Sequence, residues 1–200
     1  MLIDVTTLLQ TNLEASIDAK QKMLRSQEIL SFFKQAADAV LEAYKNGGCL
    51  YIAGNGGSAA DAQHLAAEFV SKLAYDRASL PAEALTVDSS ILTAIGNDYG
   101  FENIFSRQIE GKMQPGDVFL ALSTSGNSLN ILEGLKTCRS LGITSVAFLG
   151  KDGGLAATLA DYCVVVPGNT TATIQEIHIV LAHTLCGYVE NFIFGDENDL

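Results

Sequence analysis

Short apolar segments alternate with helical stretches from residue 50 onward, and this alternation constrains the fold more than any other feature of the chain. The segments are apolar on nearly every residue, which is typical of strands buried on both faces. Strands separated by helices pair in parallel, with helices covering both faces of the sheet. The pattern therefore predicts an α/β fold with a doubly wound, flavodoxin-like sheet of five parallel strands. We expect strands at 50–53, 82–86, 118–123, 144–149 and 162–166, and helices at 58–74, 89–95, 105–112, 129–141, 153–160 and 173–194.

The first 46 residues have a different character, because residues 4–46 contain no Gly or Pro. Apolar residues recur there at roughly helical spacing, which predicts two helices that break near Ser26 and end at 46–48. Apolar content on more than one helix face favours packing on the core and on neighbouring subunits. We therefore divide the chain into a helical segment at 1–46, one domain at 47–195 and a frayed acidic tail at 196–200.

The charge balance is acidic, with 23 Asp and Glu against 12 Lys and Arg and a formal net charge of −11. Such a charge argues against nonspecific binding to nucleic acid or to a membrane surface. It allows a phosphorylated ligand, because backbone amides, hydroxyls and a metal can offset negative charge locally. The N-terminus lacks a signal-peptide pattern, and no uninterrupted apolar run approaches the length of a membrane span. We expect a cytoplasmic protein that binds neither nucleic acid nor membranes.

Two loops follow two of the expected strands. The first reads Gly-Asn-Gly-Gly-Ser at 54–58, and the second reads Ser-Thr-Ser-Gly-Asn-Ser at 123–128. Ligands of open parallel sheets bind outside the carboxyl ends of the strands, where backbone N–H groups and hydroxyls can meet phosphate oxygens. A plain helix cap explains the serine loop equally well when that loop is taken alone. The first loop is neither GxGxxG nor a P-loop, which favours a sugar phosphate over a nucleotide.

His64 and Glu68 lie four residues apart on the helix expected after the first loop. They share one helix face, so they can hold a divalent metal or move a proton. Asp61 shares this face, where it can orient the His64 imidazole or cap the helix start. Of the two remaining histidines, His178 points away from His183 on a helical wheel, and we expect His178 to be structural.

Taken together, these motifs resemble the phosphoheptose isomerases, the sedoheptulose 7-phosphate isomerase branch of the sugar isomerase (SIS) domain proteins. The resemblance spans about residues 10 to 195. The serine loop is common to many SIS proteins, whereas the combination of His64, Glu68, Gln175 and His183 is more specific. The residues that carry the resemblance are 54–58, Asp61, His64, Glu68, 92–100, 123–128, Ile174-Gln175-Glu176 and His183.

The resemblance implies an aldose–ketose isomerase that converts sedoheptulose 7-phosphate to D-glycero-D-manno-heptose 7-phosphate through an enediol. This reaction is the first step of bacterial ADP-heptose precursor synthesis. The lipopolysaccharide core is the family's usual destination for the heptose, with capsule and other glycans as alternatives that the sequence leaves open. The resemblance implies one zinc ion per site, bound by His64, Glu68, Gln175 and His183, with Glu68 as the base and His183 as the acid. It implies substrate contacts from Asn55, Gly56, Gly57, Glu68, Asn97, Asp98, Ser123, Thr124, Ser125, Ser128 and Gln175. The alternative for Asn97 and Asp98 is a local Asx turn within an expected turn at 97–100.

The spacing of Gln175 and His183 raises a geometric question. Eight residues correspond to a rise of roughly 12 Å in one regular helix. Either Gln175 lies at a distorted helix start, or two subunits contribute to each metal site. We favour a site at a subunit interface, and the resemblance implies a homotetramer with such sites.

Two alternatives remain open. A SIS relative acts as a non-catalytic binding protein of the bacterial replication initiator, and it does not need a complete set of metal ligands and acid–base groups. Other SIS enzymes act on arabinose 5-phosphate or on amino-sugar phosphates. The presence of Glu68, Gln175 and His183 beside His64 favours the enzyme.

Overall fold

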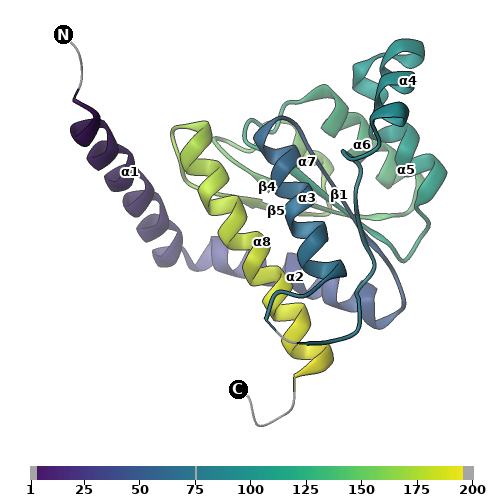
Figure 1. Cartoon of the computed structure of the whole chain (residues 1–200), viewed down its shortest axis with the longest axis horizontal. Helices are drawn as coiled ribbons and strands as arrows, with labels where there is room; N and C mark the ends of the chain where they lie inside the picture. The colour runs from purple at the N-terminus through teal and green to yellow at the C-terminus, as the bar shows by residue number, and fades with distance from the viewer. Residues whose placement is uncertain (1–3, 75, 196–200) are drawn as a thin grey trace.

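The fold is a five-stranded parallel sheet with helices on both faces, seen in a computed structural model that describes residues 4–74 and 76–195 (Figure 1). The strand order is β2-β1-β3-β4-β5, and every pair of neighbours is parallel. The predicted α/β class and doubly wound sheet are confirmed. The predicted tail at 196–200 lies outside the described residues. The strands are β1 Leu50–Gly54, β2 Ala82–Ala84, β3 Val118–Ser123, β4 Thr144–Leu149 and β5 Tyr162–Val165.

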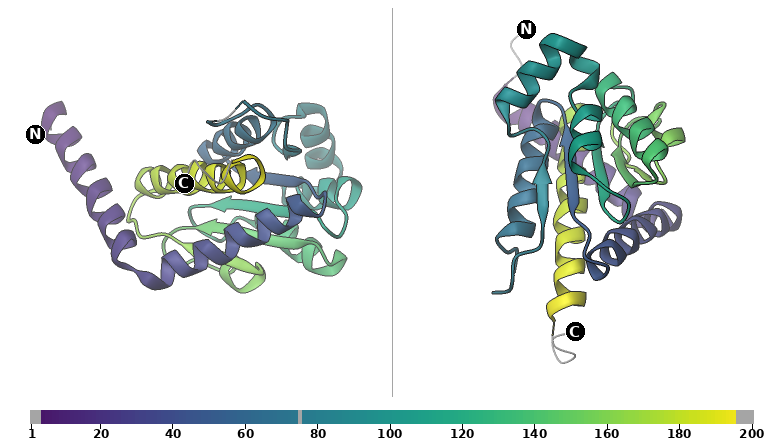
Figure 2. Two further views of the ribbon diagram at one scale, coloured as in Figure 1. Left: turned by 90° about the horizontal axis from the view of Figure 1, so that it is seen from below. Right: turned by 90° about the vertical axis from the view of Figure 1, so that its right-hand side faces the viewer.

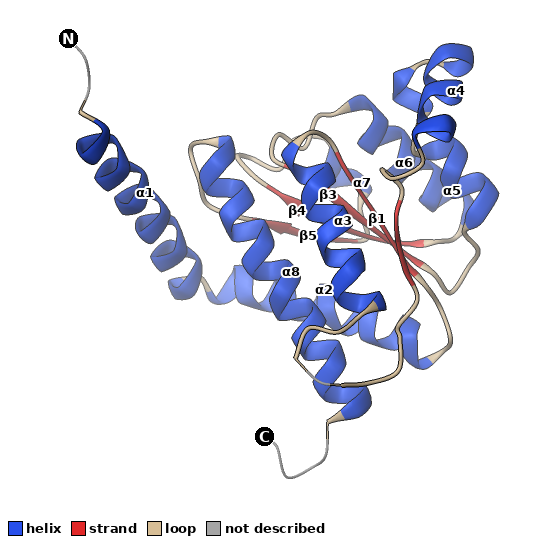
Figure 3. Ribbon diagram, viewed as in Figure 1, coloured by secondary structure: helices blue, strands red, loops and turns tan. Residues whose placement is uncertain are grey.

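Helices surround the sheet on both sides, as Figure 3 shows. They are α1 Val5–Arg25, α2 Gln27–Lys45, α3 Gly57–Val70, α4 Ser89–Tyr99, α5 Ser106–Lys112, α6 Leu129–Leu141, α7 Ala156–Leu159 and α8 Thr171–Phe194, with a 3₁₀ turn η1 at Phe101–Asn103. The predicted break at Ser26 is confirmed, because Ser26 separates α1 from α2 and its side chain accepts a hydrogen bond from the Ile29 amide.

Three predicted boundaries are wrong by three or more residues. The turn expected at 97–100 is the end of α4, which Asp88 caps at its start and which stops at Gly100 with φ +91°. Helix α7 begins at Ala156, because Gly153 and Gly154 have positive φ angles that a helix cannot contain. Helix α3 ends at Val70, several residues before the expected end at residue 74.

The strands bury both of their faces, which explains their continuous apolar sequence. Successive residues of β3 and β4 alternate between two hydrophobic clusters. Leu120 and Phe148 belong to the cluster that includes residues of α2, α3 and α8. Phe119 and Leu149 belong to the cluster that includes residues of α5, α6 and α7. The sheet thus lies between two hydrophobic cores and contributes side chains to both.

Helix α1 extends away from the body of the molecule (Figures 1 and 2). Ser16 and Ala19 are its buried residues, whereas Leu8, Leu9 and Ile17 expose their apolar side chains. In contrast, α8 packs against α1, α2 and α3. Among the described helices, only α8 has the length and apolar composition of a membrane span, and 44% of its apolar window is buried inside the protein. A core helix meets the same two criteria.

Candidate active site

The sheet topology brings the two predicted loops to one place. Strand β1 pairs with β2 on one side and with β3 on the other, so the strand order reverses direction between β1 and β3. Ligands of doubly wound sheets bind at this reversal, outside the carboxyl ends of the strands. The loop at 54–58 follows β1 and the loop at 123–128 follows β3. Each loop leads into a helix, α3 in the first case and α6 in the second.

Three of the four predicted metal ligands meet between α3 and α8. The Nε2 atoms of His64 and His183 lie 2.8 Å apart, and Glu68 Oε1 lies 3.6 Å from His64 Nε2. One donor atom from each of the three side chains lies within 4.8 Å of the others. We call His64, Glu68 and His183 the triad. Two imidazole nitrogens and a carboxylate are conventional zinc ligands, so this donor set fits a divalent metal.

The two imidazoles of the triad face each other through their Nε2 atoms. At 2.8 Å the two Nε2 atoms are within hydrogen-bonding distance, and the tautomer of each ring decides which of them donates. The rings meet edge to face, with their centroids 5.1 Å apart. The Glu68 side chain is 22% exposed, which keeps its carboxylate open to a ligand. The triad therefore combines a carboxylate base with an imidazole that can gain or lose a proton.

The fourth predicted ligand, Gln175, contacts the glycine loop. Its Nε2 lies 3.5 Å from Ser58 Oγ, and a Cβ atom built on Gly57 would lie 2.4 Å from the same nitrogen. Gln175 is inside α8, which begins at Thr171 after a side-chain cap from Thr170. It therefore does not lie at a distorted helix start. A side chain at position 57 would therefore displace the Gln175 amide.

The glycine loop is tied to α6 by a pair of amides. Asn55 and Asn130 exchange two hydrogen bonds, of 2.9 and 2.8 Å, and Asn130 is buried. Sequence reasoning missed Asn130, although an Asn two residues after the serine loop was a visible signal. Gly56 has φ +57° at the start of α3, a conformation that favours glycine.

The hydroxyls of the serine loop have different environments. Ser123 Oγ accepts a hydrogen bond from the Gly126 amide and is buried, whereas Ser125 Oγ accepts one from the Asn127 amide. Ser128 precedes α6 but makes no capping hydrogen bond with its side chain, and it is half-buried together with Thr124. Ser128 is therefore not the plain helix cap that the sequence left open.

A cavity of about 530 Å³ joins the two loops. Asn55 and Gly56 of the first loop line it, together with Ser128 of the second loop. Phe101 and Glu102, from η1, also line this cavity and were not predicted. Leu129 and Asn130 complete the lining.

The other polar residues singled out in the sequence lie apart from this cavity lining. Asn97 and Asp98 are exposed on α4, where the Asn97 amide donates a 2.7 Å hydrogen bond to the Asp98 carboxylate. Burial raises the pKa of Asp61, and the nearby His64 opposes this effect. Burial lowers the pKa of His178 to about 4, and its ring lies against Phe148 in the core. His178 is thus the structural histidine that the sequence predicted.

The sequence and the fold are both similar to those of known SIS domain proteins. The family model of the SIS domain matches residues 14–150. Phosphoheptose isomerase of Aneurinibacillus thermoaerophilus is 50% identical over 189 residues, which cover 94% of this chain and 96% of that protein. Phosphoheptose isomerase 2 of Campylobacter jejuni is 49% identical over 180 residues, 90% of each chain. The solved phosphoheptose isomerases of Neisseria gonorrhoeae and Francisella tularensis superpose with TM-scores of 0.87 and 0.89, at 40% and 32% identity, each over 94% of this chain and 100% of that one.

Proposed function

The chain belongs to the phosphoheptose isomerases of the SIS domain family, and we propose that it converts sedoheptulose 7-phosphate to D-glycero-D-manno-heptose 7-phosphate. The observation that carries this proposal is the triad of His64, Glu68 and His183, held between α3 and α8 in a chain about half identical to phosphoheptose isomerases. The reaction is the first step of ADP-heptose precursor synthesis, whose product serves lipopolysaccharide core, capsule or other glycans.

Aldose–ketose isomerisation moves a proton between two adjacent carbons, and the carbonyl group moves from one of these carbons to the other. It needs a base near the carbon, an acid near the oxygen and stabilisation of the enediol. We assign the base to Glu68 and the acid to His183. The triad geometry supports this pairing, because the carboxylate and the imidazole converge from two helices on one small volume.

We also propose one zinc ion per site, held by the triad with Gln175 as the fourth ligand. Zinc supplies polarisation of the sugar carbonyl and hydroxyl oxygens when it is bound. The donor chemistry of two imidazoles and one carboxylate supports this assignment. A His183 Nε2 that binds a metal cannot donate a proton from the same atom, so the two roles of His183 belong to different states of the site.

The substrate proposal uses both loops. The phosphate binds Ser123, Thr124, Ser125 and Ser128, and the reacting end of the sugar binds Asn55, Gly56 and Gly57 near Glu68 and Gln175. The shared cavity supports this arrangement, because Asn55, Gly56 and Ser128 line it together. Asn97 and Asp98 are proposed to contact sugar hydroxyls from α4, which is followed directly by the cavity-lining turn η1.

We propose further that the protein is a cytoplasmic homotetramer with its sites at subunit interfaces. The exposed apolar residues of α1 support an oligomer. So does an apolar pocket of about 360 Å³ between α1, α2 and α8, lined by Met23, Leu24, Phe33, Val180 and neighbouring residues. Size-exclusion chromatography with light scattering measures the assembly, and a monomer would contradict it.

The direct test incubates purified protein with sedoheptulose 7-phosphate, with and without a zinc chelator, and follows the aldose product. We expect turnover that falls on chelation and returns with zinc. Arabinose 5-phosphate and an amino-sugar phosphate serve as competing substrates, and faster turnover of either would reassign the substrate. Absence of product under every metal condition, together with tight binding of the replication initiator, would replace the enzyme with the binding protein.

A further inference from the structure

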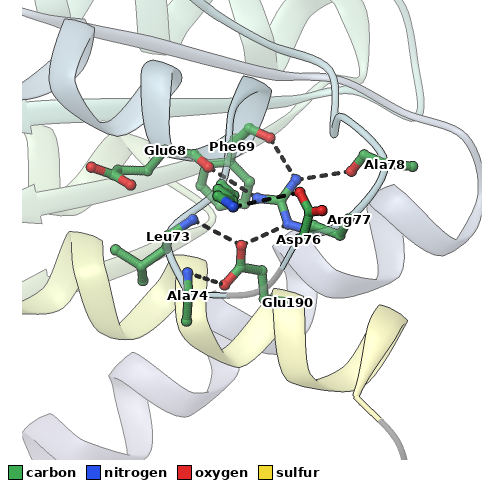
Figure 4. Close-up of polar contacts among 9 residues, drawn as sticks. Glu68, Phe69, Leu73, Ala74, Asp76, Arg77, Ala78 and Glu190 are labelled. Atoms are coloured by element: carbon green, nitrogen blue, oxygen red, sulfur yellow. Dashed lines mark hydrogen bonds and ion pairs between the residues drawn. The ribbon is translucent and has the colours of Figure 1, made fainter.

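A buried ion pair links α8 to the segment that follows α3, next to the two helices that carry the triad (Figure 4). Arg77 Nε lies 2.6 Å from Glu190 Oε1, and the two side chains are 1% and 0% exposed. Glu190 belongs to α8, seven residues after His183 and therefore on the same face of that helix. Arg77 lies in the segment that follows α3. We call Arg77 and Glu190 the clamp.

The clamp bonds to the backbone at the end of α3. The Arg77 guanidinium donates 2.9 Å hydrogen bonds to the carbonyl oxygens of Glu68 and Phe69 and a 3.0 Å bond to that of Ala78. The last carbonyls of a helix lack partners within the helix. Arg77 supplies a partner for the Glu68 carbonyl, whereas the Phe69 carbonyl also accepts a 3.1 Å hydrogen bond from the Leu80 amide. One of these carbonyls belongs to Glu68, the proposed base.

Glu190, on α8, binds the backbone of the segment that follows α3. Its carboxylate accepts hydrogen bonds of 2.9 and 3.0 Å from the amides of Leu73 and Ala74. These two amides lie where the sequence predicted that α3 would continue, so the clamp accounts for its early end. Burial raises the pKa of Glu190, but these hydrogen bonds and the Arg77 charge outweigh burial and lower it below its ordinary value.

The triad is bracketed by polar contacts between α3 and α8. Gln175 meets Ser58 toward the start of both helices, and the clamp joins their later parts. His64 and His183 meet between these two contacts. We therefore expect a change at the clamp to shift α3 relative to α8 and to change the separation of the triad atoms.

We propose that Arg77 and Glu190 are positioning residues, which set the placement of Glu68 and His64 against His183. This inference rests on the proposed isomerase function. Well-packed apolar side chains often replace the charges of a buried ion pair without loss of stability, but they cannot replace the hydrogen bonds that this pair makes to the backbone. The apolar replacement leaves the backbone groups of Glu68, Leu73 and Ala74 without their present partners. The charged pair, unlike an apolar pair, holds the backbone of Glu68 in place through the hydrogen bond from Arg77.

The test compares three variants of the full chain with the wild type. Glu190→Gln removes one charge, Arg77→Lys keeps the charge but loses the guanidinium fork, and Arg77→Met with Glu190→Leu replaces the pair with apolar side chains. Asp76→Asn is the matched control, because it removes an exposed ion pair with Lys72 from the same segment. Each protein is measured for kcat and KM with sedoheptulose 7-phosphate, for thermal unfolding, and for Co²⁺ affinity by visible absorption.

We expect the folded clamp variants to lose kcat by about 10²-fold, the size of effect that a displacement of about 1 Å produces. We expect KM to stay within about threefold, because the two substrate loops are not touched, and Co²⁺ affinity to fall about 10- to 100-fold. The control should match the wild type in all three measurements. An apolar pair that unfolds like the wild type and keeps both its kcat and its Co²⁺ affinity would overturn the proposal. Failure of all three variants to fold would assign the clamp to stability alone and would equally overturn it.

The two proposals can fail separately. A wild type that does not turn over sedoheptulose 7-phosphate contradicts the proposed function, whereas Co²⁺ affinity still reports whether the clamp positions the triad.

Discussion

His64 and His183 place their Nε2 atoms 2.8 Å apart although 119 positions separate the two residues in the sequence. Their helices α3 and α8 pack against each other and against the same hydrophobic cluster of the sheet. The contact is therefore fixed by tertiary packing of two helices, and Glu68 joins it through its i, i+4 spacing to His64.

Glu68→Gln should lower kcat by about 10²- to 10⁴-fold, because the amide keeps the shape of the side chain but cannot accept the substrate proton. Thermal unfolding should change little, since the side chain is partly exposed and its ion pair with His64 is not buried. The matched control is Glu133→Gln, which removes an exposed ion pair with Lys136 on α6. Near-normal turnover by Glu68→Gln would show that another group is the base.

Removal of either triad histidine should remove the metal. Protein purified without chelator is expected to contain about one zinc per chain. His64→Ala and His183→Ala should each lose most of it, because of the three proposed ligands that remain, only one imidazole and one carboxylate are conventional zinc ligands and the third is the weak amide of Gln175. Elemental analysis of the purified proteins measures this. His178→Leu is the control, because His178 is buried in the core and is not one of the triad residues. Retention of zinc by both triad variants would exclude the proposed ligand set.

Most of the fold is readable from the sequence, because buried parallel strands are apolar along their whole length and the Gly-rich and Ser-rich segments follow them directly. The turn expected at 97–100 was wrong because Asn-Asp-Tyr-Gly has turn composition, whereas the Asp88 cap starts a helix that runs to Tyr99. The composition of 97–100 alone does not show that the helix capped by Asp88, nine residues before Asn97, continues through these turn-forming residues.

The candidate site is only partly readable from the sequence. His64 and Glu68 were accessible because they share one helix, and the family pattern added His183 and Gln175. The sequence did not indicate the cavity residues Phe101 and Glu102, nor the clamp of Arg77 with Glu190. Their roles depend on contacts between elements that are far apart in the chain. The periodicity of residues along one helix or strand predicts which residues share a face, but it does not predict contacts between distant elements.

Gly57→Ala should act through Gln175. A Cβ atom at this position would lie 2.4 Å from Gln175 Nε2, so the flexible side chain must move. We expect kcat/KM to fall by about tenfold, the effect of one lost hydrogen bond of ordinary strength, with little change in thermal unfolding. In a Gln175→Ala background the same substitution should cause no further loss. Gly111→Ala is the control, because nothing lies within 4 Å of its Cβ position in α5, and additive losses from Gly57 and Gln175 would contradict the coupling.

Ser128→Ala and Ser123→Ala should have different effects. Ser128 lines the cavity and makes no capping bond, so its loss should raise KM for the sugar phosphate by about 10- to 100-fold without changing stability. Ser123 Oγ accepts the buried Gly126 amide, so Ser123→Ala should lower the free energy of unfolding by about 1–3 kcal/mol. Steady-state kinetics and inhibition by inorganic phosphate measure the first effect, and denaturant unfolding measures the second. Unchanged KM and phosphate inhibition in Ser128→Ala would move the phosphate site elsewhere.

His178 should make the protein less stable as the pH falls through the mildly acidic range. The pKa of an exposed histidine is 6.5, and burial lowers the pKa of His178 to about 4, against a smaller opposing effect of the Leu149 backbone. Between these values the unfolded chain binds a proton that the folded chain does not, so the stability present above pH 6.5 is lost progressively toward pH 4. The full loss is roughly 3 kcal/mol, at about 1.4 kcal/mol per pKa unit. Denaturant unfolding of the wild type and of His178→Leu across this range isolates the contribution, because carboxylates such as Glu190 titrate in both proteins. The variant should show the flatter curve, whereas parallel curves would mean that His178 takes up its proton equally in the folded and unfolded states.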